Sequence, residues 1–258
     1  MTQQGAKSEN GMSQQLFYIA MAGLNATMER VSAAANNLAN RGTTAFKAQK
    51  PVFEALPLYG QGEPDRVMVR ATEQGADLRS GAIEQTGRNL DVAVKGPGWI
   101  VVQTADGTPA LTRDGSLSIS SAGMLEDSNG HAVLGDGFAP IVLPPLQSVT
   151  IGADGTISGA LAGQNPDQIS ALARIMLTNP PNAGVQRRAD GLFTDATAPL
   201  VADAGVRLQV GALEESNADT VGMMMDMIET SRNFQMQTEM TKMVFAAAQG
   251  QSSPLSLS

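Results

Sequence analysis

Cysteine is absent from this 258-residue sequence, and histidine and tryptophan occur once each. Without cysteine the chain has no disulfide framework, no thiolate nucleophile and no cysteine-bound zinc. The single histidine, His131, lies beside an Asn129-Gly130 turn with no second metal ligand near it in the sequence. We interpret it as a turn residue, and we expect no metal ion and no cofactor.

Aromatic residues are also scarce, at 4%, and no apolar run approaches the roughly 18 residues of a membrane span. The first ten residues are polar and lack the apolar segment of a secretory signal peptide. The formal net charge of -8 argues against nucleic acid and against an acidic membrane surface as main partners. These absences remove the membrane-spanning and nucleic-acid-binding classes.

Motifs that carry chemistry are missing as well. The Gly96-Pro97-Gly98-Trp99 stretch lacks the third glycine of a dinucleotide loop, and there is no phosphate-binding loop or Gly-x-Ser-x-Gly elbow. Two carboxylate pairs, Asp77 with Glu84 and Asp91 with Glu126, have no sequence reason to meet, so solvated charges are the better interpretation. We find no catalytic site and predict that the protein is not an enzyme.

What is present is a helical pattern at each end of the chain. Near the N-terminus, apolar residues alternate at spacings of four and three, which places them on one helical stripe: Phe17, Met21, Leu24, Met28, Val31, Ala35 and Leu38. A helix from Leu16 to Asn40 would be roughly 37 Å long. Near the C-terminus the same alternation is less clean, and the assembly residues predicted there are Met223, Met227, Ile228, Phe234 and Val244.

Each stripe needs a partner helix. The two ends could close on each other as a private helical hairpin, or they could pack on neighbouring molecules. Methionine packs adaptably on varied neighbours, and polar Thr230, Gln237 and Thr241 at seam positions weaken a private two-helix coil. The pattern therefore favours a multi-helix assembly while leaving the hairpin open.

Between the two ends the period changes to short strand-like runs separated by Asp-Gly or Asn-Gly pairs, which supply the positive φ angles of tight hairpin turns. We predict an α+β fold, with long N- and C-terminal helices packed as a coiled-coil-like assembly domain and a central, mainly antiparallel β domain. The expected boundaries are a disordered leader over 1–11, an N-terminal helix and exit segment over 12–47, a linker loop over 48–65, the β domain over 66–211, a C-terminal helix over 212–249 and a tail over 250–258.

Both ends also resemble a known family. The N-terminal stretch resembles the signature of the bacterial flagellar rod and hook proteins in Asn36, Asn37, Leu38, Ala39, Asn40, Thr43 and Phe46. The family usually has glycine where this chain has Ala45. The C-terminal stretch is similar to the second family signature in Leu213, Glu214, Ser216 and Asn217. Within the family, the runs Phe53–Pro57 and Asp154–Ser158 resemble the proximal-rod type.

The resemblance implies a non-catalytic structural subunit of the proximal rod in the basal body, a periplasmic axial shaft that transmits torque. It implies export through the flagellar type III apparatus without a cleaved signal peptide. The implied partners are other rod proteins, copies of the chain itself, ring proteins at the rod base and the export apparatus. Two alternatives remain: a distal-rod or hook-type member, or a secreted β-domain enzyme with helical oligomerisation ends, which would need a cleft with converging ionisable groups.

Overall fold

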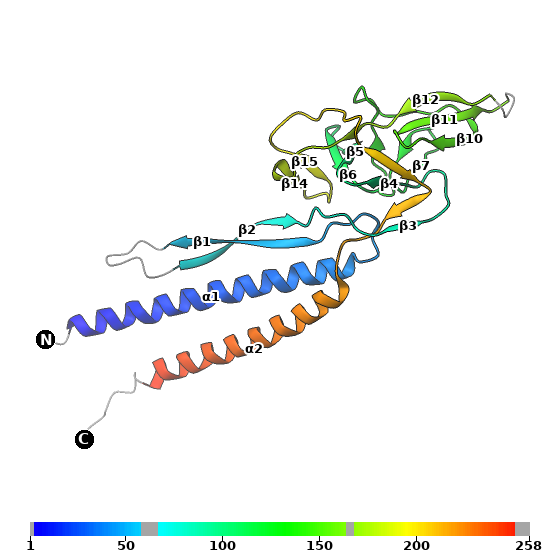
Figure 1. Cartoon of the computed structure of the whole chain (residues 1–258). Coiled ribbons are helices and arrows are strands. Elements are labelled where there is room, and N and C mark those ends of the chain that lie inside the picture. The colour runs from blue at the N-terminus through cyan, green and yellow to red at the C-terminus, as the bar shows by residue number, and fades with distance from the viewer. Residues whose placement is uncertain (1–2, 58–66, 164–167, 251–258) are drawn as a thin grey trace, which may run out of the picture. The chain divides into compact units, whose positions relative to one another are not determined.

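The computed structural model describes residues 3–57, 67–163 and 168–250, with a helix at each end and strands between them (Figure 1). The helices are α1 (Gln3–Ala39) and α2 (Thr220–Gly250). The first strands are β1 (Gln49–Pro57), β2 (Val67–Ala76), β3 (Ile83–Gln85), β4 (Val92–Lys95), β5 (Trp99–Gln103), β6 (Pro109–Thr112), β7 (Ser118–Ile119), β8 (Leu125–Glu126) and β9 (Ala132–Val133). They are followed by β10 (Leu146–Ile151), β11 (Thr156–Leu161), β12 (Ser170–Arg174), β13 (Leu177–Thr178), a 3-10 turn (Asn182–Gly184), β14 (Val185–Arg187), β15 (Phe193–Asp195), β16 (Arg207–Val210) and β17 (Ala212–Glu214).

These elements confirm the predicted α+β class with antiparallel strand pairing. The coiled-coil-like packing of the two helices stays a prediction. The start of α1 differs from the expected leader over residues 1–11, because the helix already begins at Gln3. This stretch holds good helix formers, including Ala6, Lys7 and Glu9, and extending a helix costs far less than nucleating one.

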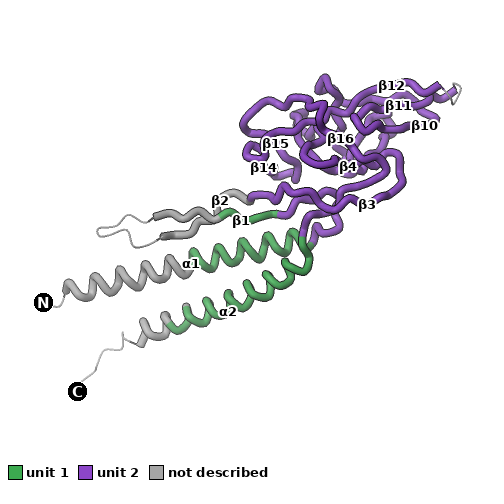
Figure 2. Tube along the Cα trace, viewed as in Figure 1, with its two compact units in different colours: residues 1–38, 49–74, 219–258 green, residues 39–48, 75–218 purple. Residues whose placement is uncertain are grey.

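The chain divides into two compact units (Figure 2). The helical unit contains Met1–Leu38, Gln49–Gln74 and Asp219–Ser258, and the β unit contains Ala39–Ala48 and Gly75–Ala218. The expected linker loop over 48–65 is therefore partly strand, since β1 pairs with β2 in a two-stranded sheet of the helical unit. The prolines that suggested a loop fit this sheet, because each strand of a two-stranded sheet has a free edge that does not need a proline N–H.

In the β unit the largest sheet has the order β14-β15-β6-β5-β9-β8-β7, with β13 also paired to β5. A three-stranded sheet follows the order β10-β11-β12, and two-stranded sheets join β16 to β4 and β17 to β3. Through these two pairs, β16 and β17, which precede α2 in the sequence, lie beside β4 and β3 from the start of the unit. Glu214 of β17 consequently lies opposite Ile83 of β3.

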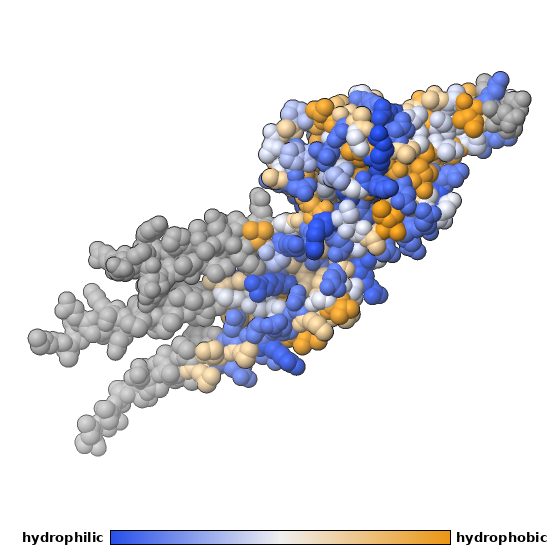
Figure 3. All heavy atoms as spheres, in the orientation of Figure 1, coloured by the Kyte–Doolittle hydropathy of each residue, from blue (hydrophilic) through white to orange (hydrophobic). Residues whose placement is uncertain are grey.

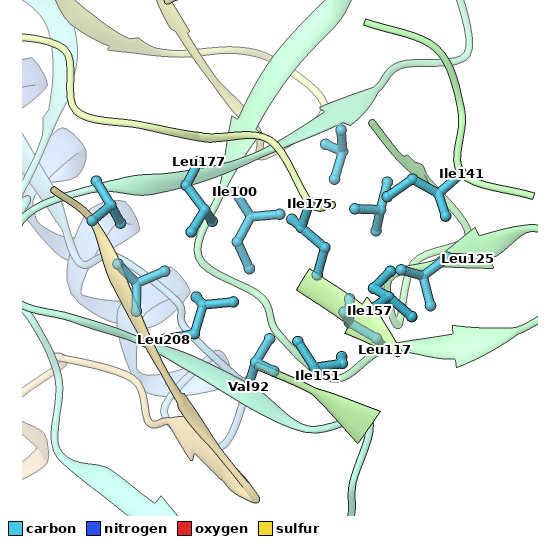
Figure 4. Packing of buried hydrophobic residues seen from close by; sticks show 14 of the residues in the cluster. Val92, Ile100, Leu117, Leu125, Ile141, Ile151, Ile157, Ile175, Leu177 and Leu208 are labelled. Atoms are coloured by element: carbon cyan, nitrogen blue, oxygen red, sulfur yellow. The ribbon is translucent and has the colours of Figure 1, made fainter. Parts of the chain in front are cut away.

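The core of the β unit lies on both faces of β5, with aliphatic residues on one face and aliphatic and aromatic residues on the other. Ile100 and Val102 belong to a large cluster of buried residues. Figure 4 shows Ile100 in this cluster together with Val92, Leu117 and Ile157. The alternate residues of β5, Trp99 and Val101, belong to a second cluster with Leu111, Leu134, Met176 and Phe193. Successive side chains of a strand point to opposite faces, so one central strand supports two cores.

Several of the Asp-Gly and Asn-Gly pairs form turns as predicted, with φ near +80° at Gly107, Gly130, Gly155 and Gly191. Gly115 is required for a different reason. A Cβ on this residue would lie 1.7 Å from the carbonyl oxygen of Val92, so only glycine allows the two backbones to approach this closely.

Candidate functional site: helix faces and the signature cluster

The helical unit makes its internal contacts with a small and polar face of α1. The amide of Asn37 donates to the carbonyl of Gln49 at 2.9 Å, and its oxygen accepts from the Gln49 N–H at 2.7 Å. Nearly three helical turns earlier, the Thr27 hydroxyl donates to the Gly23 carbonyl at 2.8 Å and lies 3.5 Å from the side-chain oxygen of Gln237 in α2. Thr27 and Asn37 are buried although neither is apolar.

The predicted apolar stripe of α1 lies about 100° around the helix from this polar face, because Leu24, Met28 and Leu38 of the stripe each directly follow a residue of the polar face. Leu24, Val31 and Leu38 are half-buried, whereas Met28 exposes 60% of its surface. Met21 and Ala35 are also exposed, and the side chain of Phe17 lies outside the described residues. The stripe is therefore incompletely covered by the described chain.

Helix α2 carries apolar residues on two opposite sides. The predicted side holds half-buried Met223 and Met227 together with partly exposed Phe234, while the side chain of Val244 lies outside the described residues. The residues of the other side are exposed, and Ile228 belongs to it with 57% of its surface in solvent. Its members are Val221, Met225, Ile228, Met236, Met240 and Met243, and we call them the outer face of α2. A helix that is apolar on both sides is typical of a position with neighbours on both sides.

Hydrophobic atoms are visible at the surface of the described parts of the molecule among hydrophilic ones (Figure 3). No helix in the described part of the chain is long and apolar enough to cross a membrane.

The second group of predicted site residues lies in the β unit and centres on Glu214. One carboxylate oxygen of Glu214 accepts from the Lys47 ammonium at 2.5 Å and from the Gly81 N–H at 2.9 Å. The other oxygen accepts from the Arg113 guanidinium at 2.8 Å. The side chains of Lys47 and Glu214 are completely buried, and that of Arg113 is 4% exposed. We call Lys47, Arg113, Glu214 and Asn217 the signature cluster.

Burial dominates the electrostatics of Lys47. Loss of solvent around the ammonium lowers the pKa of Lys47 below its ordinary value, and the adjacent Glu214 carboxylate opposes this shift. A second hydrogen bond, from the Lys47 ammonium to the carbonyl of Arg79 at 2.8 Å, helps to satisfy the ammonium. A buried charge without such partners would be very costly, so the cluster holds only as a complete set.

Asn217 fixes the chain just before α2 with hydrogen bonds from its side-chain oxygen, its side-chain amide and its backbone N–H. Its side-chain oxygen accepts from the Ala48 N–H at 2.7 Å, and its amide donates to the carbonyls of Asp77 and Arg79 at 2.7 and 2.8 Å. Its own backbone N–H donates to the carbonyl of Phe46 at 3.2 Å. The segment after α1 and the segment before α2 are thus joined to each other and to the segment before β3.

The exit from α1 is a tight turn. The N–H of Thr43 donates to the carbonyl of Asn40 at 3.1 Å, and their side chains are 3.2 Å apart. Ala45 follows with φ at +54°, and its N–H donates to the carbonyl of Glu214 at 2.7 Å. This left-handed conformation explains why glycine suits the position, because a side chain there is strained.

Phe46 takes part in a cation–π sandwich. The guanidinium carbon of Arg187 lies 5.0 Å from the ring centre of Phe46 and 5.2 Å from that of Phe193. The guanidinium also donates to the carbonyl of Lys47. Burial lowers the pKa of Arg187. This contact holds the exit segment against β14 and β15.

The other signature residues have plainer environments. Leu213 and Ser216 are half-buried, with the Ser216 hydroxyl 3.3 Å from the Ala218 N–H. Asn36 and Ala39 are exposed. The family signature therefore includes both residues of the signature cluster, such as Glu214, and residues whose side chains are exposed, such as Asn36.

The structure brings together residues that sequence reasoning did not connect. Lys47 and Arg113 were not among the predicted site residues, and they lie 167 and 101 positions from Glu214 in the chain. Nothing in a single sequence pairs Arg113 with a carboxylate 101 positions away. Their shared burial is the signal that marks them as part of the cluster.

Among the described residues, no group of histidine and carboxylate side chains could hold a metal ion. His131 bonds to the buried Asp127 at 2.9 Å, and Asp91 bonds to Arg88 and Thr86. A cleft of ≈ 700 Å³ lies beside β7 and β10, and the residues that line it, Pro144 and Pro145 among them, include no acidic, basic or histidine side chain. This cleft lacks the converging ionisable groups that the enzyme alternative requires.

Two protein-family models match parts of this chain, and both of them cover residues of the signature cluster. The family described as the flagellar hook protein FlgE/F/G D1 domain matches residues 93–159, and the family described as flagellar basal body rod FlgEFG protein C-terminal matches residues 209–245. The second match includes Glu214, Asn217 and the outer face of α2.

Full-length relatives cover most of the chain. The flagellar basal-body rod protein FlgF of Salmonella typhimurium is 39% identical over 227 residues, covering 85% of this chain and 90% of the relative. FlgF of Escherichia coli is 38% identical over 234 residues, covering 88% and 92%. The rod protein FlgG of Agrobacterium fabrum is 28% identical over 246 residues, covering 86% and 92%. The chain therefore belongs to the flagellar basal-body rod protein family, and within it resembles these FlgF proteins more than this FlgG protein.

Proposed function

We propose that this protein is a structural subunit of the flagellar basal-body rod, of the proximal-rod type, and that it assembles through the apolar faces of its two terminal helices. The family supports the rod assignment, and the higher identity to FlgF proteins supports the proximal type. The observation that carries the mechanism is the placement of apolar residues on α2, which exposes Ile228 and its neighbours on the outer face.

The energetics favour ordering of these faces on assembly. Burying one Met, Leu or Ile side chain is worth about 1.5–3 kcal/mol. Several such residues on each subunit would offset the conformational entropy lost when the helices become ordered. The internal contacts of α1 use Gly23, Thr27 and Asn37, so association need not break them.

The signature cluster gives the helices a firm attachment. Segments that lead from α1 and into α2 converge on Glu214 and Asn217 inside the β unit. Torque applied through either helix would reach the same hydrogen-bonded point, which is centred on the buried Glu214. We infer that this cluster is the mechanical anchor of the subunit.

The remaining parts of the proposal follow from the family. The subunit would lie in the periplasmic part of the flagellum, contact copies of itself, other rod proteins and the ring proteins at the rod base, and leave the cell through the type III apparatus without signal cleavage. No catalytic step is proposed, since the relatives are rod proteins and no enzyme family is indicated.

The test uses two charge substitutions, Leu24→Asp and Ile228→Asp, in a bacterium that lacks its own FlgF-type rod protein. Matched controls place the same charge on exposed polar neighbours, as Asn25→Asp and Ser231→Asp. We expect both test variants to abolish swimming and incorporation into purified basal bodies, while both controls retain them. Fluorescence of the single tryptophan, Trp99, reports whether the β unit stays folded. Normal incorporation of Ile228→Asp would refute assembly through the outer face.

A further inference from the structure

Half of the methionines of this chain are concentrated in one helix. Of 14 methionines, seven lie in α2, and the outer face holds four of them: Met225, Met236, Met240 and Met243. Each of these four exposes between 56% and 67% of its surface. By contrast, Met176 in the core of the β unit is 1% exposed.

Exposure decides the chemistry available to a thioether. An exposed methionine sulfur attacks the terminal oxygen of a peroxide, forming an S–O bond while the O–O bond breaks and water leaves. Sulfur loses two electrons and the peroxide gains them, so the step balances with one peroxide per methionine. The chain has no cysteine, so no thiol of its own competes for the oxidant.

We propose that the outer face of α2 is a site of reversible methionine oxidation by peroxide-class oxidants, and that sulfoxides on this face stop the unassembled subunit from being incorporated. The second half rests on the proposed function. A sulfoxide converts a flexible apolar side chain into a polar one. On this face it would add polar groups to the apolar surface that Val221 and Ile228 share, where these two residues expose 66% and 57% of their surface.

The selectivity of the reaction is tested on the purified full chain with hydrogen peroxide, followed by peptide mass spectrometry over time. We expect sulfoxide at Met225, Met240 and Met243 to form at least about ten times faster than at Met176, because Met176 reacts only after local opening of the core. Methionine sulfoxide reductases A and B together should restore the original masses. Equal rates at Met176 and on the outer face would overturn the assignment of the site.

The consequence for assembly is tested without oxidant in cells. Glutamine imitates the polarity of the sulfoxide, and leucine keeps the face apolar and cannot be oxidised. We expect the triple variant Met225→Gln, Met236→Gln, Met240→Gln to lose incorporation, and the corresponding triple leucine variant to keep it. A control carrying Glu229→Gln and Glu239→Gln changes exposed positions of the same helix without altering the apolar face.

The outcomes separate the two proposals. Incorporation of the glutamine triple variant would overturn the oxidation switch, while failure of Ile228→Asp in the same assay would leave the rod function intact. Failure of the leucine variant with an unchanged Trp99 signal would show that the face requires methionine itself, which also contradicts the switch. Incorporation of both the glutamine triple variant and Ile228→Asp would refute the proposed function together with the switch.

Discussion

Replacing Glu214 by glutamine is the sharpest perturbation of the signature cluster. The change keeps the size of the side chain and removes its charge. Lys47 and Arg113 would then remain buried without an anion, and the new amide N–H₂ would face one of these donors instead of accepting from it. Removing one partner of a buried ion pair typically costs about 3–5 kcal/mol. We expect a loss of this size from the unfolding free energy of the β unit.

The assay is denaturant and thermal unfolding followed by the fluorescence of Trp99. This residue is 3% exposed, and the Arg113 guanidinium lies 5.5 Å from its ring centre, so the signal reports on the unit that contains the cluster. The expected loss corresponds to a fall in Tm of about 6–20 °C for a unit of this size. The exposed neighbour offers a matched control, since Glu215→Gln should change stability by no more than about 0.5 kcal/mol.

A double-mutant cycle tests whether Glu214 and Lys47 are energetically coupled, in addition to the size of the loss for Glu214→Gln. Lys47→Met removes one of the two orphaned cations, so the double variant with Glu214→Gln should be at least about 1 kcal/mol more stable than the sum of the single losses predicts. Strict additivity would refute the idea that the three charges act as one set. A loss below about 1 kcal/mol for Glu214→Gln alone would refute the cost assigned to unpaired buried charge.

Three further predictions concern the backbone and the titration of the β unit. Ala45→Gly relieves the left-handed strain at φ +54° but loosens the unfolded chain, so denaturation should show a change between zero and about 1 kcal/mol of added stability; a net loss would contradict the strain. Gly115→Ala should cost at least about 3 kcal/mol because its Cβ would meet the Val92 carbonyl, whereas Gly137→Ala, which meets nothing within 4 Å, should be nearly silent by the same measurement. Burial raises the pKa of Asp114, so between the ordinary aspartate pKa and the raised folded pKa the folded state holds a proton that the unfolded state has released. As pH rises through this window, the unfolding free energy of the protein should therefore fall relative to that of Asp114→Asn. A rise in the relative unfolding free energy over the same window would contradict the assignment.

The sequence predicted elements wherever a local pattern determines the structure. Asp154-Gly155 and Asp190-Gly191 form turns with positive φ at glycine, as short-range turn chemistry requires. The period-3.5 pattern correctly indicated two long terminal helices. The strand β1 escaped prediction because its two prolines resemble loop signals, and the free edge that tolerates them is a property of the sheet and not of the segment.

The signature cluster and the helix faces were predictable only in part, because local sequence patterns do not encode contacts between distant residues. Glu214 and Asn217 were found through family resemblance, but their partners lie more than 100 residues away, and no local pattern encodes such a pairing. Similarly, the internal face of α1 uses Thr27 and Asn37, which an apolar periodicity cannot detect. Of the outer face of α2, the sequence predicted only Ile228, because the heptad pattern follows Met223, Met227 and Phe234 on the opposite side of the helix.

The most direct test of the central claim is photo-crosslinking from position 228 in assembled basal bodies. A photoreactive amino acid replaces Ile228, and a second strain carries it at the exposed polar position Gln186 in the β unit. The account predicts that irradiation joins position 228 to α1 or α2 of a neighbouring rod subunit, identified by mass spectrometry of the joined peptides. Products confined to the subunit's own α1, or no product in rods that assemble normally, would contradict it.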